Sequence, residues 1–164
     1  MNKKEIMDDY RPRLLILDDE ELVTKSLRNL FLLQSDYEVV TYTSAREALL
    51  TANSLPIDLV ISDYLMPEMD GIAFLSRLKE IQPQTVRVLL TGYADKENAI
   101  RAINTVGLYQ YIEKPWDNDK LLIVAKNGLE KRALIRALES KIAELDEAHS
   151  SLKSIQAELI KAFM

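Results

Sequence analysis

The chain contains no cysteine and only one histidine among its 164 residues. It therefore cannot form disulfides or thiolate metal sites, and one histidine cannot build a histidine-based metal cluster. Any metal ion is expected to be held by oxygen ligands. Glycine is also scarce, with four in the chain, and no Gly-rich phosphate loop follows any apolar run. This pattern argues against a nucleotide-binding domain.

Long hydrophobic runs are absent as well. No segment has the length needed to cross a bilayer, and residues 1–13 mix lysines with acids instead of forming an apolar signal segment. We therefore expect a cytoplasmic protein that does not contact the membrane. The formal net charge of -5 argues against nucleic-acid binding by this chain and suits an acidic cleft for a hard cation.

Five short apolar runs alternate with segments of helical periodicity, and the length suits one buried domain plus an appendage. Each connection is long enough for a parallel crossover, so the alternation predicts an α/β fold with a doubly wound parallel sheet. The predicted strands are residues 13–17, 37–42, 58–63, 86–90 and 108–112. Helices are expected after each strand, with Ser44 capping the second and Asp117 or Asn118 capping the last.

Polar side chains stand at the ends of four predicted strands: the pair Asp18 and Asp19, then Asp63, Thr91 and Lys114. The carboxyl ends of parallel strands share one edge, so these side chains are expected to converge there. Three carboxylates in one cleft repel one another unless cations compensate them. A few carboxylate ligands suit Mg²⁺, and a lysine and a hydroxyl beside them suit phosphoryl transfer onto an aspartate.

Several short motifs stand in a fixed order along the chain. They are Asp18-Asp19, Asp63 with Met66-Pro67 and Asp70-Gly71 behind it, Thr91-Gly92, Tyr111, and Lys114-Pro115. Together they resemble the receiver domain of bacterial two-component response regulators, over about residues 12–129. The resemblance implies a flavodoxin-like five-stranded parallel sheet of order 2-1-3-4-5, which alternation alone does not determine.

The resemblance also implies roles for the acidic residues. Asp63 is the expected phosphoacceptor, receiving a phosphoryl group from a sensor histidine kinase, a phosphotransfer protein or a small phosphodonor. Mg²⁺, or Mn²⁺, is the expected cofactor. Its expected ligands are Asp19 and Asp63 directly, Asp18 through water, and the backbone carbonyl of Leu65.

Lys114 is expected to pair with a phosphoryl oxygen, and Thr91 to hydrogen-bond another. The movement of Thr91 opens space for Tyr111 to rotate inward, which makes these two residues the expected switch. Such a protein is a signalling switch, and it is no enzyme beyond catalysing its own phosphorylation and dephosphorylation on aspartate. The resemblance also favours a cis peptide bond at Lys114-Pro115.

Structural explanations remain open beside these roles. The three aspartates can be caps or turn residues, Thr91 a strand-end hydroxyl, and Tyr111 a core aromatic. Glu68 and Asp70 are expected to be solvated loop acids. An aspartyl-phosphate hydrolase with a flavodoxin-like core is the alternative function. The chain offers it neither a cap insertion nor a second acid two residues beyond Asp63.

The C-terminal segment shows the heptad spacing of a coiled coil. We expect a receiver domain at residues 1–128, a helical stalk at 129–164, and an output domain beyond Met164. The stalk is expected to form a homodimer through residues 132–163. The alternative is an amphipathic helix that packs on the receiver domain of its own chain or on an output domain. The core positions are Ile135, Leu138, Ile142, Leu145, His149, Leu152, Gln156, Leu159 and Phe163.

Overall fold

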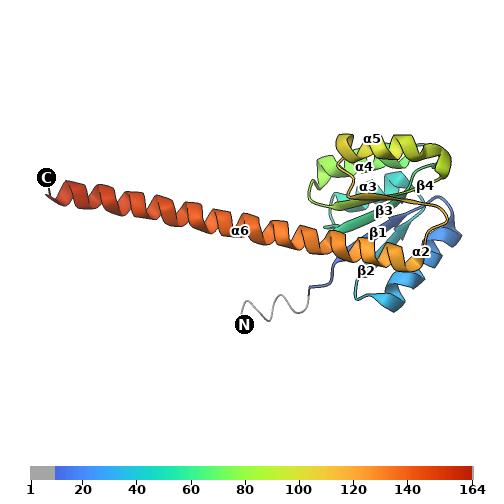
Figure 1. Ribbon diagram of the computed structural model, residues 1–164, viewed down its shortest axis with the longest axis horizontal. Coiled ribbons are helices and arrows are strands. Elements are labelled where there is room, and N and C mark those ends of the chain that lie inside the picture. Colours follow the sequence, from blue (N-terminus) through green and yellow to red (C-terminus); the bar gives the residue numbers. More distant parts are fainter. Residues whose placement is uncertain (1–9, 164) are drawn as a thin grey trace. The chain divides into compact units, whose positions relative to one another are not determined.

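The computed structural model describes residues 10–163. The chain forms two compact units, residues 1–129 and 130–164. The first unit holds a sheet flanked by helices, and the second consists of the later part of one long helix, α6 (Asn118–Phe163) (Figure 1). Residues 1–9, which belong to the first predicted domain, and Met164 lie outside the described residues. Among the described residues, no helix combines the length and apolar character that a membrane span requires.

The first unit is built on five parallel strands in the order β2-β1-β3-β4-β5. This topology confirms the predicted flavodoxin-like fold. Strand β3 lies in the middle of the sheet, and all five of its residues are buried. The strands are β1 (Arg13–Leu17), β2 (Glu38–Tyr42), β3 (Leu59–Asp63), β4 (Val86–Thr91) and β5 (Gln110–Glu113).

Helices cover both faces of the sheet (Figure 1). Helices α3, α4 and α5 share one apolar core with one set of strand side chains, and α2 shares the other core with the first residues of α6. This division follows from the alternation of side chains along each strand. The helices are α2 (Glu21–Gln34), α3 (Ala45–Ala52), α4 (Gly71–Ile81), α5 (Lys96–Thr105) and the short 3-10 helix η1 (Tyr93–Asp95).

Capping residues set the starts of several helices. The Ser44 side chain accepts a hydrogen bond from the Glu47 amide, which confirms its predicted role as the cap of α3. Asp117 accepts from the Lys120 amide at the start of α6. Asp70 is exposed as expected, but it is more than a solvated loop acid, because its carboxylate accepts from the Ala73 amide 2.8 Å away and caps α4.

Glycine is required at two positions where a helix lies against the sheet. At Gly71, the first residue of α4, an added Cβ would overlap the backbone carbonyl of Asp63 and lie 2.8 Å from the Leu89 side chain. At Gly128 an added Cβ would lie 2.8 Å from Val86. Gly71 therefore allows α4 to begin directly against the end of β3.

A buried arginine joins the segments that precede β4 and β5. The Arg87 guanidinium, on β4, donates to the carbonyls of Pro83 (3.0 Å) and Thr85 (2.9 Å), which precede its own strand. It also donates to Val106 (3.1 Å) and Gly107 (3.2 Å) after α5. These carbonyls compensate the burial of the charge.

Candidate functional site

Three carboxylates meet at the carboxyl edge of the sheet. Asp18 directly follows β1 and is fully buried, whereas Asp19 is exposed. Asp63 is the last residue of β3 and is buried. One oxygen from each of the three residues lies within 4.8 Å of the other two. The described residues therefore include an all-oxygen cluster of the size that a metal ion occupies.

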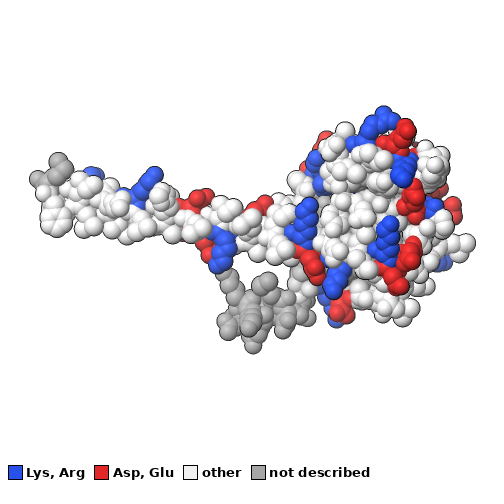
Figure 2. Space-filling view, in the orientation of Figure 1, with Lys and Arg blue, Asp and Glu red and all other residues white. Residues whose placement is uncertain are grey.

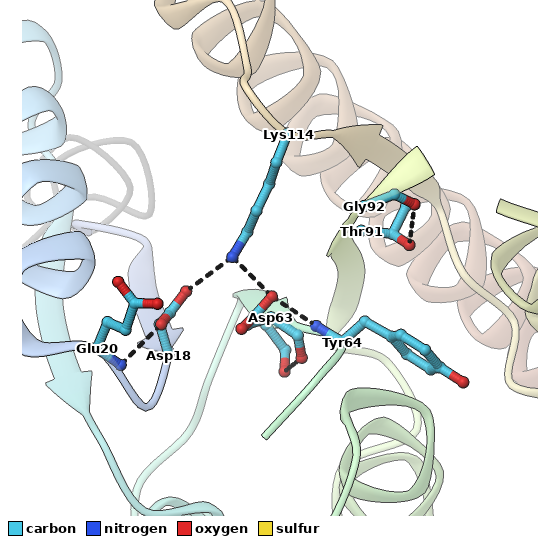
Figure 3. A network of polar contacts seen from close by, with 8 residues as sticks. Asp18, Glu20, Asp63, Tyr64, Thr91, Gly92 and Lys114 are labelled. Atoms are coloured by element: carbon cyan, nitrogen blue, oxygen red, sulfur yellow. Dashed lines mark hydrogen bonds and ion pairs between the residues drawn. The ribbon is translucent and has the colours of Figure 1, made fainter. Parts of the chain in front are cut away.

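Lys114 lies between two of these carboxylates (Figure 3). Its Nζ is 2.8 Å from Asp63 Oδ1 and 3.3 Å from Asp18 Oδ2. The residue follows β5, and its backbone amide donates to the Thr91 carbonyl at 2.9 Å, which ties its position to the end of β4. The Lys114-Pro115 peptide bond is cis, in line with the expectation from the resemblance.

The electrostatics of the cluster are unfavourable without a further cation. Burial raises the pKa of Asp18, and the neighbouring charge of Asp63 adds to this rise. The Glu20 amide, which donates to Asp18 Oδ1 at 2.9 Å, and Lys114 act in the opposite direction. Burial alone would lower the pKa of Lys114, but the two carboxylates outweigh burial and raise it. Lys114 is therefore held in its charged form.

The two oxygens of Asp63 differ in their surroundings. Oδ1 accepts from the Tyr64 amide at 2.9 Å and from Lys114. Among the described residues, none donates a hydrogen bond to Oδ2. The sequence did not reveal the Tyr64 and Glu20 donors, because a backbone amide has no signature in residue type. They orient the two carboxylates, and both donors to Asp63 act on its Oδ1.

The remaining predicted site residues lie outside the ion-paired cluster. Thr91, the last residue of β4, is fully buried, and its hydroxyl donates to the Gly92 carbonyl at 3.2 Å (Figure 3). Tyr111, on β5, is half-buried and packs against the core between the sheet and α3, α4 and α5. Leu65 lies in the loop after β3, and its side chain is 64% exposed. Among the described residues, no hydrogen bond or ion pair joins Thr91 or Tyr111 to Asp63.

The donor set fits a small hard cation. Carboxylate oxygens are the ligands that Mg²⁺ prefers, and Mg²⁺ completes its coordination with water and substrate oxygens. Burial, with a smaller contribution from the charge of Asp63, raises the pKa of Asp18 and so disfavours its ionised form. A divalent ion at Asp18, Asp19 and Asp63 would favour the ionised carboxylates.

Comparison with known proteins agrees with this geometry. The family model of the response regulator receiver domain matches residues 14–126. The chain belongs to the response regulator receiver family. Receiver domains bind Mg²⁺ at such an acidic cluster and interact with histidine kinases. The sequence resemblance is thereby confirmed.

Relatives of this receiver have different descriptions. The hydrogenase transcriptional regulatory protein HoxA of Cupriavidus necator is 34% identical over 128 residues, which cover 78% of this chain and 26% of HoxA. The signal receiver domain of an HD domain-containing protein from Pseudomonas fluorescens Pf-5 is 36% identical. Its structure matches with a TM-score of 0.71 over 76% of this chain and 98% of that chain.

A third match is the structure described as adenylate cyclase from Rhodopirellula baltica, which is 25% identical with a TM-score of 0.76. It covers 81% of this receiver and 98% of that chain. The receiver spans only about a quarter of the length of HoxA, at 26%. The comparisons therefore establish a receiver domain of a two-component response regulator, and the activities of the longer proteins do not transfer with it.

Proposed function

We propose that the chain is a phosphorylation-activated switch in which Asp63 accepts a phosphoryl group from a sensor histidine kinase or a phosphotransfer protein. The observation that carries this proposal is the position of Lys114 Nζ, 2.8 Å from Asp63 and 3.3 Å from Asp18 in an otherwise acidic cluster. A cation in this place stabilises negative charge as it develops beside Asp63. We also propose a cytoplasmic location and no nucleic-acid binding by this chain itself.

The transfer requires an oxygen of Asp63 to attack the phosphorus of the donor phosphohistidine. An O–P bond forms, the P–N bond breaks, and the imidazole keeps the electron pair and takes up a proton. Asp19 and Asp63 would hold Mg²⁺, or Mn²⁺, directly, Asp18 would hold it through water, and the Leu65 carbonyl would be a further ligand. When bound, the ion neutralises charge on the phosphoryl oxygens. Lys114 pairs with a phosphoryl oxygen in the product.

Thr91 and Tyr111 are proposed to read out the phosphoryl group. The Thr91 hydroxyl donates to the Gly92 carbonyl in this structure, so it has to exchange that acceptor for a phosphoryl oxygen. This exchange draws the Thr91-Gly92 loop toward Asp63 and gives Tyr111 room to turn further into the core. Two discrete arrangements of these side chains form the switch.

We further propose that residues 1–128 act as the receiver and residues 129–164 as a stalk. The exposed apolar residues of the stalk at heptad spacing support a homodimer through residues 132–163. The stalk passes the state of the receiver to an output domain or partner. The relatives are different kinds of protein, and no feature of this chain selects among them.

The decisive experiment measures phosphoryl transfer from acetyl phosphate with Mg²⁺. Intact-mass spectrometry should show one added phosphoryl group on the wild type and on Glu68→Gln, a control at an exposed acid in the loop after β3. The Asp63→Asn variant should gain none. Equal labelling of Asp63→Asn would overturn the assignment. Rapid multiple turnover of acetyl phosphate without a persistent adduct would favour the alternative, an aspartyl-phosphate hydrolase.

A further inference from the structure

The second unit carries more exposed apolar side chains than one heptad register uses. Its four leucines at seven-residue spacing are all between 53% and 69% exposed, and Ile155 is 53% exposed outside the expected core positions. On the face in Figure 2, charged side chains of α6 appear only at intervals between uncharged surface (Figure 2). The four leucines are Leu138, Leu145, Leu152 and Leu159.

One way of packing two copies continues a single register along the whole segment. Ile135 and Ile142 then occupy a positions, and the four leucines occupy d positions. β-branched residues at a with leucine at d favour a parallel two-stranded coiled coil. Lys141 at a g position then faces Asp146 at the next e position of the second copy, an attractive pair. Below Leu145, however, this register buries two polar a residues, His149 and Gln156.

A second packing is open to the residues on the C-terminal side of Leu145. If the core passes from Leu145 to Ala148, the same leucines become a positions, and Ala148, Ile155 and Ala162 become d positions. Counted from Ile135, the core spacing is then 3-4-3-3-4-3-4-3. An inserted step of three residues is a stammer, which overwinds the coiled coil locally.

The second packing suits only the part of the segment on the C-terminal side of Leu145. On the N-terminal side it would bury Lys141 in the core and break the ion pair between Lys141 and Glu144, whose charged atoms lie 3.3 Å apart. On the C-terminal side of Leu145 the second packing buries Ile155 and moves His149 and Gln156 to positions that flank the core. Ile160 favours the continuous packing, because it flanks that core and lies outside the other. Each packing of the C-terminal part thus has its own penalty. The continuous packing buries polar groups, and the stammered packing overwinds the coiled coil locally.

Helix α6 links these packings to the receiver. Its first turns bury Leu121, Val124 and Ala125 in the core of the first unit, and the helix is continuous to Phe163. A change at the start of α6 is therefore passed along a hydrogen-bonded helix. In a two-stranded coiled coil, exchanging a/d for d/g core positions corresponds to rotating each helix by about 50°.

We propose that a second copy of this chain occupies the apolar face of residues 134–163 and packs in two alternative ways on the C-terminal side of Leu145. One packing is continuous, and the other has a stammer at Leu145–Ala148. Phosphorylation shifts the balance between the two. This inference rests on the proposed function, because it needs both the dimer and the phosphorylated state. It adds a device by which the stalk itself has two outputs.

The absence of cysteine makes disulfide crosslinking of the full chain a clean test. His149→Cys reports the continuous packing, Ala148→Cys the stammered one, and Leu152→Cys both. Ser150→Cys, outside both cores, gives the background. We expect Ala148→Cys and His149→Cys each to crosslink well above Ser150→Cys. Acetyl phosphate with Mg²⁺ should change the ratio of the two several-fold.

A second pair of variants repeats the measurement: Ile155→Cys reports the stammered packing and Gln156→Cys the continuous one. The ratio of their crosslinking must change in the same direction, which guards against an effect of one substitution on the packing. The shift must vanish when Asp63→Asn is added. Crosslinking at only one packing in both states, or an unchanged ratio in a chain that mass spectrometry shows to be phosphorylated, overturns the inference. Absence of a Leu152→Cys crosslink, or of any phosphoryl adduct, instead shows that the proposed function has failed, and the inference with it.

Discussion

Lys114 sets the charge balance of the carboxyl edge. It lies within ion-pair distance of both buried carboxylates, and they raise its pKa in spite of its burial. One ammonium cannot neutralise Asp18, Asp19 and Asp63 together. The first unit is therefore expected to be less stable without a divalent ion than with one, because metal binding to the folded state shifts the folding equilibrium.

Asp18 provides the test of this balance. Burial and Asp63 place its pKa above the value in the unfolded chain, so ionisation of Asp18 lowers the free energy of unfolding as pH rises through that pKa. In EDTA at pH 7, Asp18→Asn should therefore unfold at higher denaturant concentration than the wild type. The advantage should shrink at acidic pH, where both side chains are neutral, and Mg²⁺ should stabilise the variant less than the wild type. Urea titrations with and without Mg²⁺ measure this, and a variant less stable than the wild type in EDTA at pH 7 contradicts it.

At the scale of elements, the junction of β3 and α4 leaves no space for a side chain at Gly71. A methyl group at Gly71 would overlap the Asp63 carbonyl, so Gly71→Ala should force the start of α4 away from the sheet. We expect a loss of about 1–3 kcal/mol in the free energy of unfolding, typical of overpacking. Labelling by acetyl phosphate should also slow, because Asp63 moves with its carbonyl.

Gly92→Ala is the matched control for Gly71→Ala. An added Cβ at Gly92 has its nearest neighbour, Asp95 Oδ2, at 3.8 Å, an ordinary contact. Its free energy of unfolding should stay within about 0.5 kcal/mol of the wild type. Denaturant unfolding of both variants decides the matter. Equal stability of the two would show that the junction has room to adapt.

The sequence predicted the elements well where periodicity decides them. Alternating apolar runs and helical stripes give the five strands and their helices, and the strand order came with the family resemblance. The differences are local and depend on tertiary contacts: η1 precedes α5, and β5 begins at Gln110 instead of Leu108. Arg87 lies within a buried strand, and only the structure shows the four carbonyls that compensate its charge.

The candidate site was predictable because parallel strands end at one edge. That rule alone brings Asp18, Asp63 and Lys114 together, as the structure does. Their chemical roles, and those of Thr91 and Tyr111, stay predictions until phosphorylation is measured. The capping role of Asp70 was missed, because its loop position fitted a solvated acid equally well.

For the whole molecule, the division near residue 129 gives a direct test of assembly. A chain ending at residue 129 keeps all five strands and the apolar cores of the first unit, so it should fold and be monomeric. The full chain should dimerise at micromolar concentration through residues 132–163. Sedimentation equilibrium of both chains measures this, and a monomeric full chain would refute the dimer.

The central position of β3 has a consequence for hydrogen exchange. Its amides lie between β1 and β4 with every residue buried, whereas β5 pairs with β4 alone. Amides of central strands exchange only through the largest unfolding events, and those of edge strands exchange through smaller openings. The proposed phosphoacceptor therefore ends the strand expected to open most rarely, and Tyr111 lies on one that opens more readily. Phosphorylation should leave the slow exchange of β3 nearly unchanged and alter protection along β5, where a small change in free energy is enough to alter the local population.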